Sequence, residues 1–167
     1  NRDQLNDDGD SIGDACDSFY CVVVDPANEA DCLDPKGPFK VHGGGAMTLK
    51  HGETMRLPLF ANRNGAAIDY TWTVVARPKG SSAPIENPKG AVTMSRHWEY
   101  AYVDGSVPTF TADVDGEYTI QVKATLAFPD RAYPEAKDST SQLKLQVGDP
   151  AKAGACSVKG KTTRSTS

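Results

Sequence analysis

The chain has 167 residues, with 18 Lys and Arg against 22 Asp and Glu and a formal net charge of -4 at pH 7. This length fits one ordinary domain with a small appendage. The shortage of clustered basic residues argues against a nucleic-acid partner. The sequence also contains no run of about 18 apolar residues, the length that a membrane-spanning helix requires.

The charge is unevenly distributed along the chain. Residues 1–35 contain nine Asp and one Glu against Arg2 alone, a net charge of -9, whereas the remaining residues carry +5. A short acidic stretch of this kind favours a cation site.

Residues 6–17 place oxygen-bearing side chains at the spacing of a twelve-residue calcium loop. Calcium binds six to eight oxygen ligands, and alternate loop positions can direct carboxylates at one point. Without a cation the carboxylates repel one another, so we expect calcium to be part of the fold. The alternative is a solvated acidic linker. The predicted ligands are Asn6, Asp8, Asp10, Asp14 and Asp17, with the backbone carbonyl of Ile12.

An EF-hand would place amphipathic helices on both sides of this loop, and neither flank has helical periodicity. The segment instead resembles a thrombospondin type 3 repeat, in which Asp-rich loops alternate with cysteine. The resemblance implies an extracellular, calcium-filled, disulfide-linked spacer, with further repeats expected before Asn1. Arg2, Asn6 and Ser11 depart from the pattern. The matching residues are Asn1, Asp3, Gln4, Asp8, Gly9, Asp10, Ile12, Gly13, Asp14, Cys16 and Asp17.

The four cysteines, Cys16, Cys21, Cys32 and Cys156, lack the spacing and the neighbouring histidines of a zinc site. We expect two disulfides and therefore an oxidising, extracellular or cell-surface location. Three pairings remain open. A short local loop favours Cys21 with Cys32, which leaves Cys16 to tie the acidic segment to Cys156 near the other end of the chain.

From about residue 40 the sequence consists of short apolar or alternating runs separated by Gly, Pro, Asn and Asp, a pattern typical of all-β domains. Seven or eight strands fit two packed sheets. Tyr20–Val24 could add an edge strand. The predicted strands are Ala46–Leu49, Thr54–Phe60, Tyr70–Ala76, Ala91–Met94, Trp98–Tyr102, Thr109–Ala112, Glu117–Phe128 and Gln142–Val147.

Two aromatic residues indicate an immunoglobulin-like sandwich. Tyr118 follows an Asp-Gly turn as in a tyrosine corner, and Trp72 lies mid-strand where such folds bury a Trp. The runs 70–83, 108–122 and 142–147 also resemble the PKD-like family of bacterial surface and secreted proteins. That resemblance implies a non-catalytic extracellular module.

The sequence offers little that indicates catalysis. His42-Gly-Gly-Gly45 is similar to an esterase oxyanion loop, but no Gly-x-Ser-x-Gly accompanies it, so we interpret it as a flexible linker. Trp98, Tyr100 and Tyr102 could form an exposed platform for a sugar or protein ligand, although core packing of the same face is the favoured interpretation.

These patterns predict three parts: a calcium-binding segment over residues 1–35, a PKD-like β-sandwich over 36–148, and a flexible tail over 149–167 anchored by Cys156. We expect a non-enzymatic, calcium-binding structural or adhesion module of a bacterial surface or secreted protein, with other surface proteins or polysaccharide as partners. The alternatives are a carbohydrate-contacting module of a secreted hydrolase and a subunit of a surface filament.

Overall fold

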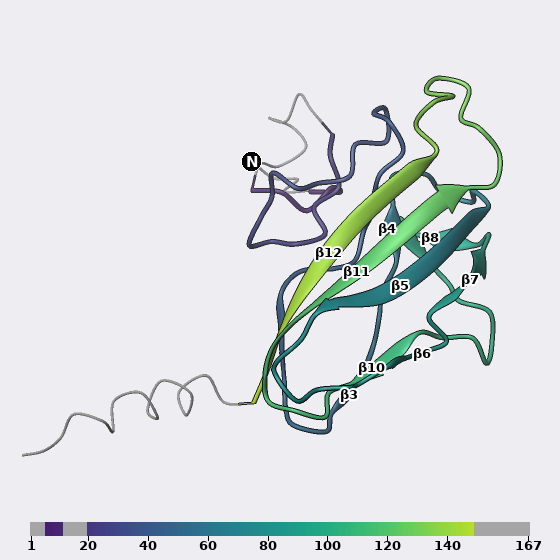
Figure 1. Ribbon diagram of the computed structural model, residues 1–167. Helices are drawn as coiled ribbons and strands as arrows, with labels where there is room; N and C mark the ends of the chain where they lie inside the picture. The colour runs from purple at the N-terminus through teal and green to yellow at the C-terminus, as the bar shows by residue number, and fades with distance from the viewer. Residues whose placement is uncertain (1–5, 12–19, 149–167) are drawn as a thin grey trace, which may run out of the picture.

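The protein is an immunoglobulin-like β-sandwich (Figure 1). The computed structural model describes residues 6–11 and 20–148, and within these ranges every regular element is a β-strand. No helix in this described part is long and apolar enough to cross a membrane. The strands are β1 (Val41–His42), β2 (Met47–Leu49), β3 (Thr54–Arg56), β4 (Phe60–Ala61), β5 (Ile68–Ala76), β6 (Ile85–Glu86), β7 (Lys89–Val92), β8 (Ser95–Arg96), β9 (Glu99–Tyr100), β10 (Thr109–Thr111), β11 (Gly116–Leu126) and β12 (Asp138–Val147).

One layer is a five-stranded sheet in the order β2-β12-β11-β5-β7. Its three long strands, β5, β11 and β12, run side by side in Figure 1 and pair antiparallel, while β2 pairs parallel to the end of β12. The predicted alternation is confirmed in β11 and in the second half of β12, because every second side chain there is buried on the inner face. These buried residues are Tyr118, Ile120, Val122, Ala124, Leu126, Leu143, Leu145 and Val147.

The opposite layer consists of two small sheets, β3-β10-β6 and β1-β4-β9-β8. Thr54–Phe60 was expected as one strand, but it is divided into β3 and β4 by Leu57, Pro58 and Leu59. Proline has no N–H for a sheet ladder, so the regular pairing stops there. The chain nevertheless stays extended, and Leu57 and Leu59 are both fully buried.

The predicted tyrosine corner is present. The Tyr118 hydroxyl donates a hydrogen bond to the Val114 carbonyl oxygen at 2.7 Å, and the Val114 N–H donates to the same hydroxyl at 3.2 Å. Trp72 is buried between the layers, as the sequence indicated. Both features are typical of immunoglobulin-like sandwiches.

The glycine run after His42 is not a flexible linker, and this expectation was wrong. Val41 and His42 form β1, and residues 41–44 are all buried. The backbone N–H of Gly43 donates to Ser141 Oγ at 3.0 Å, which ties the run to β12. A Cβ atom at Gly43 would lie only 3.3 Å from the Trp72 ring, so glycine permits the close approach of backbone and indole.

Candidate functional site

The structure describes the first half of the predicted calcium loop. Asp8 is only 2% exposed, and its Oδ2 accepts a hydrogen bond from the Cys21 backbone N–H at 2.9 Å. The Asn6 side chain accepts from the Gly9 N–H at 2.8 Å and donates to the Asp10 carbonyl at 2.5 Å. Gly9 has a φ of 80°, which glycine adopts without strain. These contacts form a tight turn at the start of the loop.

The other predicted ligands, Ile12, Asp14 and Asp17, lie outside the described residues. Within residues 6–11 and 20–148, no three His, Cys, Asp or Glu side chains gather as a metal site. Asp8 and Asn6 nevertheless fit the chemistry of calcium, because oxygen atoms that accept one hydrogen bond keep a lone pair for a hard cation.

Cys21 and Cys32 form a disulfide, which confirms the favoured local pairing. Beside it, Val22 and Leu33 exchange both backbone hydrogen bonds, at 2.9 and 2.8 Å. The expected edge strand over Tyr20–Val24 is therefore reduced to a single bridge. Cys16 and Cys156 lie outside the described residues, as does the predicted tail over 149–167. We refer to residues 20–40, which contain this disulfide, as the connector.

Two polar residues of the sandwich hold the connector in place. Asn62 is buried, and its amide nitrogen donates to the carbonyl oxygens of Asp34 and Pro38 at 2.7 and 2.8 Å. The Arg63 guanidinium donates to the Gly37 carbonyl at 2.7 Å and also pairs with Asp130 at 2.5 Å. The hydrogen bond from Arg63 lowers the pKa of Asp130. A buried amide bonded in this way fixes backbone that forms no sheet ladder.

A second contact joins the connector to β1. At the end of the connector, directly before β1, Lys40 Nζ lies 2.5 Å from Asp31 Oδ1 and donates to the Cys32 carbonyl at 3.0 Å. His42 Nε2 lies 3.2 Å from Asp31 Oδ2 without forming a hydrogen bond of good geometry. Burial opposes ionisation of Asp31, but its contacts with Lys40 and His42 outweigh this and lower its pKa. The acidic residues after Cys21 are therefore partly structural.

The aromatic residues suggested as a ligand platform do not share an exposed face. Tyr100 and Tyr102 are buried in the core, and each hydroxyl is hydrogen-bonded there. Trp98 is half-buried and lies in the turn between β8 and β9, not in a strand. Tyr100 and Tyr102 thus follow the favoured interpretation of core packing, and the turn interrupts the alternation that the less favoured three-ring platform required.

Comparisons with known proteins do not assign the chain to a family. No family model and no curated protein matches it, so the thrombospondin type 3 and PKD-like features remain resemblances. Among solved structures, the third ScaB cohesin of R. flavefaciens, solved with a group 1 dockerin, is 13% identical, with a TM-score of 0.37 over 69% of this chain and 99% of that one.

Two further structures have the same level of likeness. A non-cellulosomal cohesin from the archaeon Archaeoglobus fulgidus is 9% identical, with a TM-score of 0.33 over 72% of this chain and 98% of that one. A conjugative transposon lipoprotein from Bacteroides eggerthii is 11% identical, with a TM-score of 0.37 over 65% and 96% of the two chains. Likeness this weak says nothing about function.

Sequence reasoning missed Asn62, Arg63 and His42 as anchors of the connector. A single Asn-Arg pair in a turn carries no periodic or motif signal. For His42 the sequence contains one hint, its position directly before three glycines. A glycine run permits close packing of the backbone as readily as it permits flexibility.

Proposed function

We propose that the protein is a non-enzymatic, extracellular structural or adhesion module in which calcium rigidifies the N-terminal segment and the disulfide-bonded connector carries that order to the sandwich. The observation that supports this most directly is the buried carboxylate of Asp8, which bonds the backbone of Cys21. A ligand of the predicted loop is thereby joined to the disulfide.

The path from the loop to the sandwich consists of short, directional contacts. Asp8 holds Cys21, the disulfide joins Cys21 to Cys32, and Lys40 bonds both the Cys32 carbonyl and Asp31. Among these contacts the hydrogen bond between Asp8 and Cys21 is buried, and it fixes orientation because an alternative position would leave polar groups unpaired. The mechanism is therefore mechanical: an ion that orders the loop also sets the direction in which the chain enters the sandwich.

The disulfide also supports the location. Structural disulfides persist in oxidising compartments, which include the cell surface and the extracellular medium. Extracellular calcium is abundant enough to occupy even weak oxygen-ligand sites. The proposed cofactor and the proposed compartment are thus consistent with each other.

Calorimetric titration of the full chain with calcium tests this proposal. We expect saturable binding that is lost in Asp8→Ala combined with Asp10→Ala and kept in Asp7→Asn, which removes a charge from the same loop at a position outside the ligand spacing. Chelation should also speed proteolysis of residues 1–35 in the wild type. Binding that survives the double substitution, or unchanged proteolysis on chelation, would contradict the proposal.

A further inference from the structure

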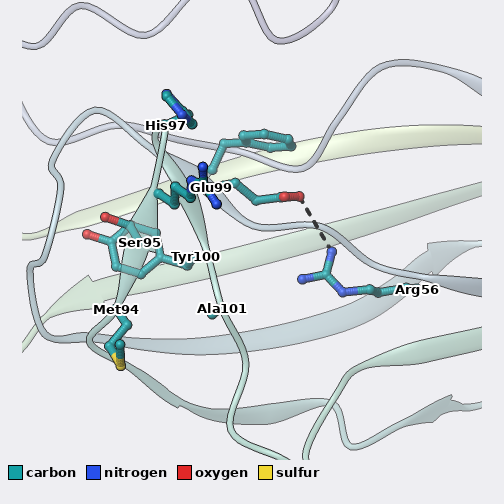
Figure 2. A pocket seen from close by; sticks show the side chains of 9 residues that line it. Arg56, Met94, Ser95, His97, Glu99, Tyr100 and Ala101 are labelled. Atoms are coloured by element: carbon teal, nitrogen blue, oxygen red, sulfur yellow. Dashed lines mark ion pairs between the residues drawn. The ribbon is translucent and has the colours of Figure 1, made fainter.

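The outer face of the β1-β4-β9-β8 sheet is covered at one end and open at the other. Cross-strand pairing places His42, Phe60, Glu99 and Arg96 in one row, and directly opposed residues point to the same face. Asp31 of the connector covers the row at His42. At the other end lies a surface cleft of about 540 Å³, whose lining includes Arg56, Phe60, Met94, Ser95, Arg96 and Glu99 (Figure 2).

The cleft combines apolar surface with positive charge that is incompletely neutralised. Met94 is 73% exposed, and Phe60 adds a half-buried ring. Glu99 points toward Arg56, with 3.6 Å between their charged groups (Figure 2). In the described part of the chain, the second guanidinium, that of Arg96, has neither an ion pair nor a hydrogen bond. One cation is therefore available to a ligand.

The turn that carries the cleft is held in an unusual backbone conformation. His97 and Trp98 have φ values of 51° and 69°, which two-residue hairpin turns usually assign to Asn-Gly. A bulky residue is strained in this region unless its surroundings impose it. The Trp98 N–H donates to Asn64 Oδ1 at 3.1 Å, and its carbonyl accepts from the Ala61 N–H at 3.0 Å. The strained turn fixes Arg96 opposite Glu99.

The free edge of β8 supplies backbone groups beside the cleft. β8 is the last strand of its sheet, and the Ala101 N–H donates to the Met94 carbonyl across the hairpin at 2.9 Å. Hydrogen bonding alternates along antiparallel strands, so the N–H and C=O of the next residue, Ser95, face away from β9. An extended peptide could bond them.

We propose that this cleft binds an extended, acidic segment of another surface protein, in which an apolar side chain and a carboxylate lie two residues apart and therefore share one face of the strand. A carboxylate would pair with Arg96, an apolar side chain would cover Met94 and Phe60, and the peptide backbone would bond Ser95. Polysaccharide fits less well, because stacking on sugar rings requires a fully exposed aromatic face, and in the cleft Tyr100 is buried and Phe60 is half-buried. This site goes beyond the proposed calcium-dependent role and does not require it.

The test is an NMR titration of the ¹⁵N-labelled full chain with a capped synthetic peptide of repeating Val-Thr-Glu-Thr, in which Val and Glu share one face. We expect saturable shifts at Met94, Glu99 and Ala101, and at least about tenfold weaker binding by Arg96→Glu. Arg131→Glu is the matched control, because Arg131 is exposed in another loop. Unchanged shifts elsewhere in the spectrum show that each variant is folded. The same titration in chelator should give the same affinity, which separates this proposal from the calcium proposal.

Two control ligands complete the experiment. A peptide with Gln in place of Glu should bind more weakly, because it cannot form the ion pair with Arg96, and oligogalacturonate tests an acidic polysaccharide. The proposal is overturned if the Val-Thr-Glu-Thr peptide gives no shifts at the cleft, if Arg131→Glu weakens binding as much as Arg96→Glu, or if oligogalacturonate binds the cleft and the peptide does not.

Discussion

The indole N–H of Trp72 donates a hydrogen bond to the Tyr102 hydroxyl at 3.3 Å, which joins the two layers of the sandwich. The same hydroxyl donates to the Leu57 carbonyl oxygen at 2.7 Å. Leu57 precedes Pro58, where the regular ladder is interrupted, so a side chain satisfies a backbone acceptor in the gap. Burial raises the pKa of Tyr102, which keeps its hydroxyl protonated and able to donate.

Tyr102→Phe should therefore destabilise the sandwich more than the removal of an exposed tyrosine hydroxyl does. The change leaves the Leu57 carbonyl and the Trp72 N–H without this partner, and buried unpaired polar groups cost about 1–3 kcal/mol each. We expect the free energy of unfolding in urea to fall by at least about 2 kcal/mol. Tyr133→Phe is the control, because its hydroxyl donates to the Lys36 carbonyl at 2.9 Å at an exposed position where water can replace it. Equal losses in both variants would contradict the assigned role of Tyr102.

The sequence predicted the long strands well because their apolar residues alternate. In β11 the apolar residues at every second position from Tyr118 to Leu126 predict which side chains face inward. The Asp-Gly turn before Tyr118 identifies the tyrosine corner. Trp72 was likewise placed correctly in the core. In these elements the local pattern and the tertiary packing agree.

The β8–β9 hairpin and β1 could not be predicted, because their local signals indicate something else. His97-Trp98 lacks the Asn or Gly that marks a two-residue hairpin, and tertiary contacts such as those of Trp98 with Asn64 and Ala61 hold the turn. Glycines have no side chain to show periodicity, so Gly43 gave no sign of its packing against Trp72. Calcium binding by the loop that contains Asn6 and Asp8 rests on the spacing of its oxygen-bearing residues and remains a prediction.

Gly45→Ala should loosen the connector without unfolding the sandwich. A Cβ atom at this position would lie 2.6 Å from Asp25 Oδ1 and 2.7 Å from its Cγ. Rotation of Asp25 away from the new methyl group would break the hydrogen bond that its Oδ1 accepts from the Ala27 N–H at 3.0 Å. Overpacking of this kind costs about 1–3 kcal/mol. We expect faster proteolysis within residues 20–40 and a nearly unchanged urea midpoint for the sandwich.

The double variant Gly45→Ala with Asp25→Ala provides the control. It removes the carboxylate and leaves only the Asp25 Cβ, at 3.2 Å from the added methyl group, so most of the protection against proteolysis should return. If the double variant is cleaved as fast as Gly45→Ala alone, the contact between these two residues does not hold the connector.

His42 should make the stability of the protein depend on pH in a window that begins near neutrality. Its side chain is buried, and Nδ1 accepts a hydrogen bond from the Gly44 N–H at 3.0 Å. Burial lowers the pKa of His42 from 6.5, the nearby charge of Lys40 lowers it further, and Asp31 and Asp25 act in the opposite direction. The net result is a histidine that is harder to protonate in the folded protein than in the unfolded chain.

The sign follows from proton linkage. Below pH 6.5 the unfolded chain binds a proton that folded His42 does not, so the contribution of His42 to stability is complete above 6.5 and is lost as pH falls through its folded pKa. The lowered pKa of Asp31 acts in a separate window, because its contribution is complete above 3.8 and is lost only below that value. Between pH 3.8 and 6.5, substitution of His42 should therefore change how the free energy of unfolding depends on pH.

Urea unfolding at a series of pH values, with the calcium concentration held constant, measures this effect. The wild type should lose stability steadily from pH 7 to 5, and His42→Asn should flatten the profile because the Asn amide oxygen can accept the Gly44 N–H without titrating. His51→Asn removes an exposed histidine that pairs with Asp115 at 2.7 Å, and it should leave the slope in place. If the free energy of unfolding still falls with pH in His42→Asn, the pH dependence belongs to another group. The assignment of His42 as a neutral, buried side chain beneath the connector would then be contradicted.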